Sequence, residues 1–90
     1  MIKSWTDKAW DDYVSWQEED RKIVQRINIL LKDIERNGAT KGIGKPEPLK
    51  NNLHGWYSRR IDEENRLIYR IEENGILKIS QCRGHYKRGV

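Results

Sequence analysis

The chain has 90 residues, of which 36% are hydrophobic and 36% are charged, and its aromatic residues are four Trp and four Tyr with no Phe. This length suits one small domain, residues 1–90, with a thin core, and it excludes a second core. No run of roughly eighteen apolar residues is present, so we expect no membrane-spanning helix, and the acidic, aromatic N-terminus is unlike a signal peptide. The single cysteine, Cys82, cannot form an internal disulfide, which fits a reducing cytoplasm and is typical of a small core residue.

The formal net charge of +4 is unevenly distributed along the chain. Residues 41–60 carry five cations against one acid, and residues 81–90 carry three cations and no acid. Acids are dense between residues 11 and 20. Such segregation favours a polyanion, most simply nucleic acid, facing one surface. A solvated basic face explains the same pattern, so charge alone leaves both interpretations open.

The N-terminal half has the pattern of a short strand followed by two helices. Residues 2–5 form the strand, and Thr6 suits the N-cap of a helix whose apolar residues recur at helical spacing up to Trp16. The acids of residues 18–20 suit the positive end of a second helix, which Asn37-Gly38 ends. We therefore expect a helical hairpin with an acidic elbow in solvent. The second helix has one apolar stripe, formed by Ile23, Val24, Ile27, Leu30, Leu31 and Ile34.

The C-terminal half has the pattern of an antiparallel sheet. Residues 38–52 contain both prolines and three of the seven glycines, so we expect a loop there. The hydrophobic period then changes to two, which predicts strands over 54–61 and 66–71. Asn74-Gly75 indicates a tight hairpin into a third strand over 76–82.

Helices followed by strands predict an α+β fold, with the N-terminal strand and the helical hairpin packed on a C-terminal antiparallel sheet. Alternation divides the strand over 66–71 into two faces. We expect the face covered by the helices to carry Leu67, Tyr69 and Ile71. We expect the open face, beside the basic loop, to carry Arg66, Ile68 and Arg70.

Cleavage of RNA without a metal needs a base for the ribose 2′-OH, an acid for the leaving 5′ oxygen, and cations for the charged phosphorane. Glu47 is the candidate base, because it is the only acid between residues 36 and 61 and two prolines stiffen its backbone. The alternative is an ordinary surface glutamate in a rigid turn. His54, at the start of the first strand of the sheet, is interpreted as structural.

The basic C-terminal segment offers the candidate acid. Histidine is the natural proton donor near neutral pH, which favours His85, although a tail histidine without a role is the alternative. Tyr86 beside it could stack on a base or pack against the sheet edge. Arg66, Arg59 and Arg60 are the cationic candidates. Alternation sends Arg59 and Arg60 to opposite faces, so at most one of those two serves directly.

Other common kinds of site have no counterpart in the sequence. There is no pair of cysteines or histidines at metal-ligand spacing, no Gly-rich phosphate loop before a helix, and no serine elbow. We therefore expect neither a metal site nor a cofactor. The residues alone predict a basic α+β domain with a candidate acid–base pair.

Several runs of the sequence closely resemble the Txe/YoeB toxin family, a branch of the RelE/ParE superfamily of toxin–antitoxin proteins. The runs are residues 44–53 (GKPEPLKNNL), 55–61 (GWYSRRI) and 65–69 (NRLIY), together with Trp10–Tyr13, Trp16-Gln17, Cys82-Arg83 and His85-Tyr86. The resemblance spans nearly the whole chain. It implies a RelE-like microbial ribonuclease fold and a type II toxin that cuts messenger RNA without a metal in the A site of the 70S ribosome.

The resemblance also implies residue roles and partners. The family's general base falls on Glu47, its phosphate-stabilising arginine on Arg66, and its general acid on His85. The family's RNA contacts fall on Lys50, Arg60 and Tyr86. Implied partners are messenger RNA, the ribosome, a second copy of the chain, and an antitoxin of the YefM/Axe type. We expect its acidic segment to meet cations near solvent, at Lys45, Lys50, Arg59 and Arg60.

Two other functions remain open on this scaffold. A toxin of the ParE kind poisons a protein target such as gyrase and needs no acid–base set. An inactive module would only dock an antitoxin. The match also has departures: Lys87–Val90 extend beyond the point where related sequences stop, and Gly84 replaces a bulky residue, which predicts a looser segment around His85.

Overall fold

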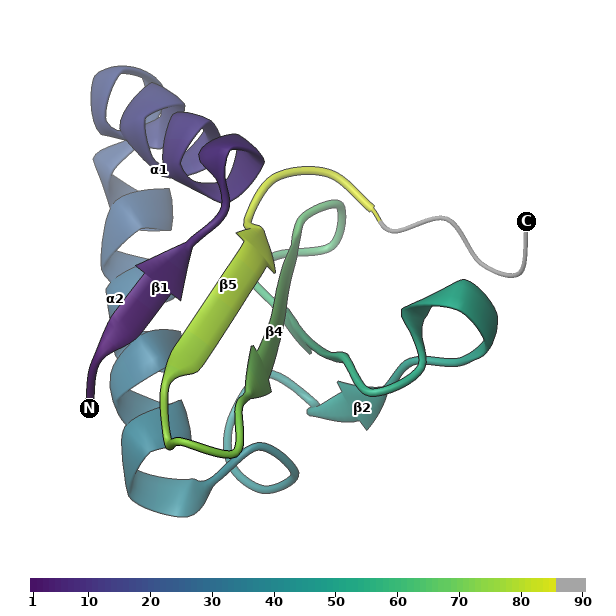
Figure 1. Ribbon diagram of the computed structural model, residues 1–90. Coiled ribbons are helices and arrows are strands. Elements are labelled where there is room, and N and C mark those ends of the chain that lie inside the picture. Colours follow the sequence, from purple (N-terminus) through teal and green to yellow (C-terminus); the bar gives the residue numbers. More distant parts are fainter. Residues whose placement is uncertain (86–90) are drawn as a thin grey trace.

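The helical hairpin predicted for the N-terminal half is present in the computed structural model, which describes residues 1–85 (Figure 1). Helix α1 spans Asp7–Glu19 and helix α2 spans Arg21–Asn37. Thr6 caps α1, since its hydroxyl oxygen accepts a backbone N–H of the first turn at 3.1 Å. Asp20 separates the helices and caps α2 in the same way at 3.0 Å. Neither helix is long and apolar enough to cross a membrane.

The strands form one five-stranded sheet in the order β1-β5-β4-β3-β2. Their bounds are β1 Lys3–Trp5, β2 Glu47–Pro48, β3 Tyr57–Arg60, β4 Arg66–Ile71 and β5 Leu77–Gln81. Strands β2 to β5 pair antiparallel, as expected for the C-terminal half. The N-terminal strand β1 pairs with β5 in parallel, which makes the sheet mixed. This pairing covers the edge that β5 would otherwise expose.

The loop expected over residues 38–52 has more structure than its composition predicts. It contains β2, which is only two residues long, and the short 3₁₀ helix η1 over Asn51–Leu53. A proline within β2 is tolerated because β2 is an edge strand. The strand expected from His54 begins instead at Tyr57, since the His54 backbone N–H closes the η1 turn by donating to the Asn51 carbonyl at 3.0 Å. His54 is exposed.

The core lies between the two helices and one face of the sheet. The expected apolar stripe of α2 supplies much of it, with Ile27, Leu30 and Ile34 fully buried. The predicted faces of β4 are confirmed. Leu67 and Tyr69 are completely buried against the helices and Ile71 packs at the margin of the core.

Cys82 is a core residue, as its type predicts. Its side chain is completely buried and its sulfur lies 3.6 Å from the Ala9 carbonyl oxygen. Burial raises the pKa of the thiol to about 12, so the thiolate is not populated near neutral pH.

Candidate functional site

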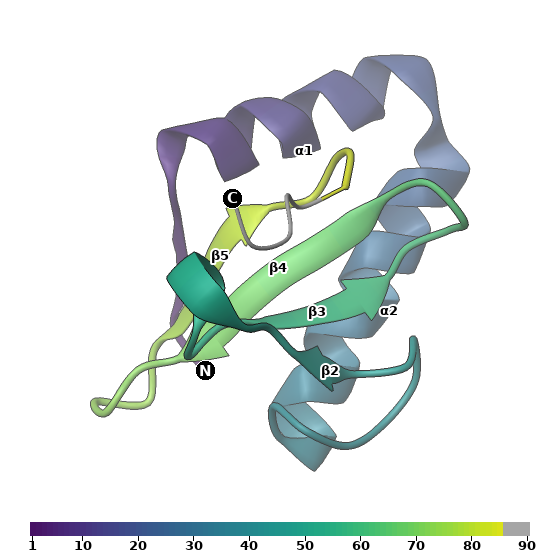
Figure 2. The ribbon, with the colours of Figure 1, turned by 90° about the vertical axis from the view of Figure 1, so that its right-hand side faces the viewer.

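The helices leave one face of the sheet open, and Figure 2 looks onto that face. Residues directly opposite each other on neighbouring strands project to the same face. Glu47 lies opposite Ser58, Ser58 opposite Ile68, and Ile68 opposite Gln81. Ile68 lies between Leu67 and Tyr69 in β4, so its side chain points to the opposite face from theirs and this row of four faces away from the helices. Ser58 and Ile68, in the middle of the row, are nevertheless buried.

Two arginines stand directly opposite each other beside this row. Arg60 of β3 pairs with Arg66 of β4, and Arg60 is exposed while Arg66 is half-buried. Like charges at opposed positions of a sheet repel each other, and an anion between them would remove that cost. Glu47 is two strands and two residues away from Arg66, so their Cα atoms are about 12 Å apart by the usual strand spacings. Glu47 and Arg66 therefore lie on the same face of the sheet, on strands separated by β3.

The backbone before Glu47 is held tightly against the sheet. Gly44 accepts the Arg60 N–H with its carbonyl at 2.7 Å, and a Cβ on Gly44 would lie 2.9 Å from a methyl carbon of Leu30. Gly44 and Lys45 both have positive φ, +81° and +53°. Glycine adopts this conformation without strain, but it is uncommon for a residue with a side chain such as Lys45, and such backbone persists only where its surroundings fix it. The exposed Glu47 carboxylate is therefore presented from a constrained edge strand.

The guanidinium of Arg66 is oriented by the loop that precedes it. Its Nη1 donates to the carbonyl oxygens of Asp62, Glu63 and Asn65 at 2.8, 3.1 and 3.1 Å. The Asp62 carboxylate organises this loop by accepting the backbone N–H groups of Glu64 and Asn65. Burial raises the pKa of Asp62, but hydrogen bonds from the Asn65 backbone and side chain and from the Glu64 N–H outweigh burial and lower the pKa below its usual value.

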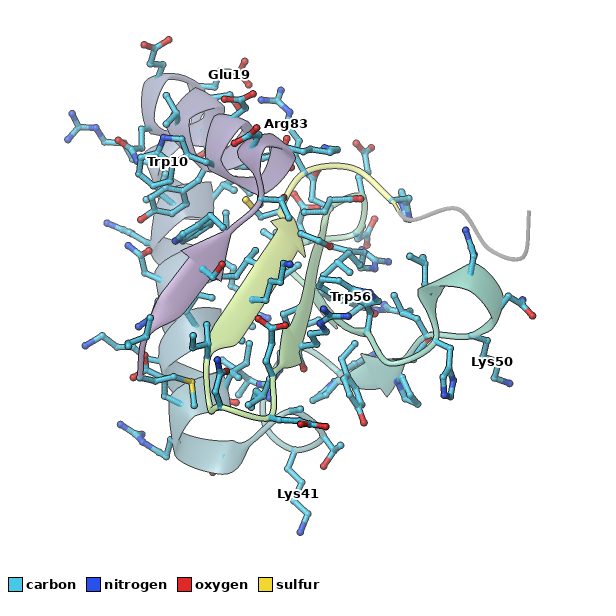
Figure 3. All side chains as sticks on the ribbon, in the orientation of Figure 1. Trp10, Glu19, Lys41, Lys50, Trp56 and Arg83 are labelled. Atoms are coloured by element: carbon cyan, nitrogen blue, oxygen red, sulfur yellow. The ribbon has the colours of Figure 1, made fainter. Side chains whose placement is uncertain are left out.

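The segment that carries His85 is anchored first to α1. The Trp16 indole N–H donates to the Cys82 carbonyl at 2.9 Å, and the Cys82 N–H donates to the buried Asp12 carboxylate at 3.1 Å. The Arg83 guanidinium lies 4.2 Å from the centre of the Trp16 ring and pairs with Glu19 at 2.6 Å. Figure 3 shows Arg83 beside Glu19. Arg83 is thereby bound to α1, although its sequence position places it with the basic C-terminal residues.

The same segment is then bound to β4. Gly84 donates its N–H to the Asn65 side-chain oxygen at 2.8 Å and accepts the Arg66 backbone N–H at 3.1 Å. His85, the next residue, is exposed. The structure thus brings the backbone of His85 next to Arg66, although the two residues are nineteen positions apart in the chain.

Arg59 is separated from the open face, as alternation predicts, but it is not near solvent, so that expectation is wrong. Its side chain is completely buried. The guanidinium makes an ion pair with Asp33 at 2.5 Å and donates to the Tyr69 hydroxyl at 2.9 Å. Its other N–H groups donate to the carbonyl oxygens of Gly38, Lys41 and Ile43. Arg59 therefore holds the loop after α2, and its donors are used within the protein.

Two further candidates for RNA contact are Lys50 and Tyr86. Lys50 is exposed at the start of η1, and Figure 3 shows it extending outward from that turn. Tyr86 lies outside the described residues. Of the six site candidates, the sheet therefore brings Glu47, Arg60 and Arg66 onto one face, with the His85 backbone beside them.

The open face carries a second cationic group that the motifs did not single out. The Arg70 guanidinium lies 4.5 Å from the centre of the Trp56 ring, and Lys78 stands directly opposite Arg70. Glu72 pairs with Arg70 at 3.2 Å. The alternation that put Arg66 and Arg70 on the open face was the only sequence signal for this group.

No cluster of three or more His, Cys, Asp or Glu side chains that could hold a metal ion occurs within residues 1–85.

Comparison with known proteins gives a consistent family. Residues 5–86 match the family model described as a YoeB-like toxin of bacterial type II toxin–antitoxin systems. Toxin YoeB of Escherichia coli K12 is 52% identical over 82 residues, which cover 91% of this chain and 95% of that protein. Two solved structures from Staphylococcus aureus, a heterotetrameric YoeB–YefM complex and a YoeB dimer, are 50% and 49% identical. Both superpose with a TM-score of 0.89 and cover 96% of this chain and 98% of theirs. The chain therefore belongs to the YoeB-like toxins of bacterial type II toxin–antitoxin systems.

Proposed function

We propose that this toxin is a metal-independent endoribonuclease that cuts messenger RNA in the A site of the 70S ribosome and so stops translation in the cytoplasm. The observation that carries the proposal is the shared open face. Glu47, Arg60 and Arg66 project from three neighbouring strands to that face, and the His85 segment is bound to the start of β4. These residues offer the groups that the proposed reaction needs, namely a base, two cations and, in the His85 segment, an acid.

In the proposed reaction, the Glu47 carboxylate accepts the proton of a ribose 2′-OH. The 2′ oxygen attacks the adjacent phosphorus, and the charge of the phosphorane is stabilised by Arg66, with Arg60 opposite it. The bond from phosphorus to the 5′ oxygen then breaks, and the protonated His85 imidazole donates its proton to that oxygen. The products are a 2′,3′-cyclic phosphate and a free 5′-OH.

The proposed dependence on the ribosome follows from the low affinity that we expect this surface to have for free RNA. A net charge of +4 supports only salt-sensitive binding, because each phosphate contact competes with counterions. Holding the 2′-OH, phosphorus and leaving oxygen in line can supply about 7–11 kcal/mol of the barrier. The small open face has exposed contacts at Lys50 and Arg60, and Tyr86 is proposed to stack on a base. We propose that the A site supplies the remaining constraint by holding the message bent.

The protein partner is proposed to be an antitoxin of the YefM/Axe type. The Staphylococcus aureus relative was solved in complex with YefM and also as a dimer. An acidic segment that folds on binding would cover the open face and neutralise the cations near Glu47. We also propose that this chain forms a dimer, as the Staphylococcus aureus relative does in its solved structure.

A reconstituted translation reaction followed by mapping of RNA ends tests the function. We expect translation to stop, with cut messages that carry a cyclic or opened 3′ phosphate and a 5′-OH. Addition of EDTA, followed by enough magnesium to keep the ribosomes intact, should leave the rate of cleavage unchanged. Fragments with 5′-phosphate ends would refute the mechanism. Intact messages together with arrested DNA supercoiling would indicate a gyrase-directed toxin instead.

A further inference from the structure

We propose that Gln81 is a positioning residue that fixes the backbone of His85 for proton donation, an inference that rests on the general-acid role proposed for His85. The Gln81 side-chain amide nitrogen donates to the carbonyl oxygens of Gly84 and His85, each at 3.1 Å. One side chain of the sheet therefore holds two consecutive carbonyls of the segment that carries the proposed acid.

A β-bulge places Gln81 where it can make these contacts. Ile68 pairs with Gln81, whereas the next residue of β4, Tyr69, pairs with Ile79, so β5 contains one extra residue. A bulge of this kind changes the direction of the side chains that follow it. Cys82 consequently enters the core, and Gln81 faces the open side in the same row as Glu47. The two hydrogen bonds from the Gln81 amide to the Gly84 and His85 carbonyls, called the clamp below, therefore lie on the same face as the proposed reaction.

Gly84 makes the clamp geometrically accessible. Its φ of +84° is the left-handed conformation that glycine adopts without strain. The nearest atom to a Cβ added there is the Gln81 amide nitrogen, at 3.9 Å. The turn lets Gly84 bind Asn65 and Arg66 through its N–H and carbonyl while the same carbonyl accepts from Gln81. Gln81 thus restrains a segment that contains a glycine.

The rate of proton donation depends strongly on such restraint. A displacement of a catalytic group by about 1 Å can cost up to roughly 10²-fold in rate. His85 is exposed, and the hydrogen bonds from Gln81 to the Gly84 and His85 carbonyls restrain its backbone. We expect Gln81→Met, which keeps the length of the side chain and removes the donor, to slow cleavage by about 10–10²-fold. Gln25→Met, at an exposed position of α2, is the matched control and should leave the rate unchanged.

The test uses a message with a single sulfur atom in place of the bridging 5′ oxygen at the cut, held in a programmed ribosome. In this substrate the bond from phosphorus to sulfur breaks and a thiolate leaves without needing a proton. Single-turnover rates are measured for the wild type, Gln81→Met, His85→Ala and Glu47→Ala. On the oxygen substrate all three variants should be slow. On the sulfur substrate Gln81→Met and His85→Ala should both regain the wild-type rate, while Glu47→Ala stays slow.

The outcomes separate this inference from the function on which it rests. Failure of the sulfur substrate to rescue His85→Ala would overturn the general-acid role and the positioning role with it. Rescue of His85→Ala without rescue of Gln81→Met would overturn only the positioning role, because Gln81 would then contact RNA or support the fold. A wild-type rate for Gln81→Met on the oxygen substrate would also overturn the positioning role. As an independent check, the ¹⁵N–¹H nuclear Overhauser effect at the His85 amide should fall in Gln81→Met, and an unchanged value would refute the clamp.

Discussion

Arg59 and Arg60 are adjacent in the chain, and their replacement by methionine should have opposite effects. Arg59 is completely buried and Arg60 is exposed on the open face. Arg59→Met should destabilise the fold strongly, whereas Arg60→Met should leave stability nearly unchanged and slow RNA cleavage. Because β3 alternates between the two faces, the pair separates what holds the fold from what contacts the ligand.

The magnitude for Arg59→Met follows from its contacts. Methionine fills most of the same space but offers no donor to Asp33 or to the Tyr69 hydroxyl, and three loop carbonyls lose their partner as well. Removal of one partner from a buried ion pair costs about 3–5 kcal/mol. Because about 1 kcal/mol shifts the melting temperature of a domain of this size by roughly 4–8 °C, the expected fall is on the order of 12–40 °C.

For Arg60→Met the expected change in stability is within about 0.5 kcal/mol, the usual range for a surface position. The backbone bond from the Arg60 N–H to Gly44 remains, and removal of the charge relieves the repulsion between Arg60 and Arg66. Thermal unfolding followed by circular dichroism measures the two stabilities, and single-turnover cleavage on programmed ribosomes measures the activities. A melting temperature for Arg59→Met within a few degrees of the wild type would contradict the structural role of Arg59. A wild-type cleavage rate for Arg60→Met would remove Arg60 from the proposed site.

The remaining predictions concern other parts of the site. Gly44→Ala should cost about 1–3 kcal/mol and slow cleavage, whereas Gly75→Ala, at a similar φ but with open space around it, should cost less and leave cleavage unchanged in parallel melting and rate assays. The lowered pKa of Asp62 means that its contribution to stability is present above the usual value of 3.8 and is lost as pH falls below it, so melting curves of Asp62→Asn should be less sensitive to acid than those of the wild type. Replacement of Glu47 or of His85 by alanine should slow cleavage by roughly 10²–10⁴-fold, and an unaffected rate would require a different base or acid. Antitoxin affinity, measured by titration calorimetry, should fall with added salt because Lys45, Lys50 and Arg60 are exposed, and a complex indifferent to salt would count against coverage of the open face.

Much of the fold could be predicted because local signals agree with the tertiary structure. The caps at Thr6 and Asp20, the apolar stripe of α2 and the alternation of β4 each depend on residues close together in the chain. The pairing partner of β1 is different in kind. Residues 3–5 carry no pattern that distinguishes the edge of β5 from any other edge, so the mixed character of the sheet depends on long-range geometry. Strand β2, two residues long, lies below the length at which alternation can be detected.

The site was predictable to a similar extent. Alternation alone separated Arg59 from Arg60, but the sequence could not show that Arg59 is buried, because its partners Asp33 and Tyr69 are distant in the chain. The bulge in β5 also has no local signal. Without it, alternation would place Ser80 rather than Gln81 opposite Ile68, and the clamp on the His85 segment would not form.

The two parts of the proposed site are held in place by different sets of contacts. The strand of Glu47 is fixed by Gly44, which packs against α2, and the preceding loop is fixed by the buried Arg59. The segment of His85 is fixed instead by α1, through Trp16 and Asp12, and by Gln81. The register of β2, β3, β4 and β5 sets the distance between the strand of the proposed base and the segment of the proposed acid. A change that shifts this register should therefore abolish cleavage even where every proposed catalytic side chain is retained. Loss of the contacts that hold only the Glu47 strand, or only the His85 segment, should impair one proton transfer and leave the other intact.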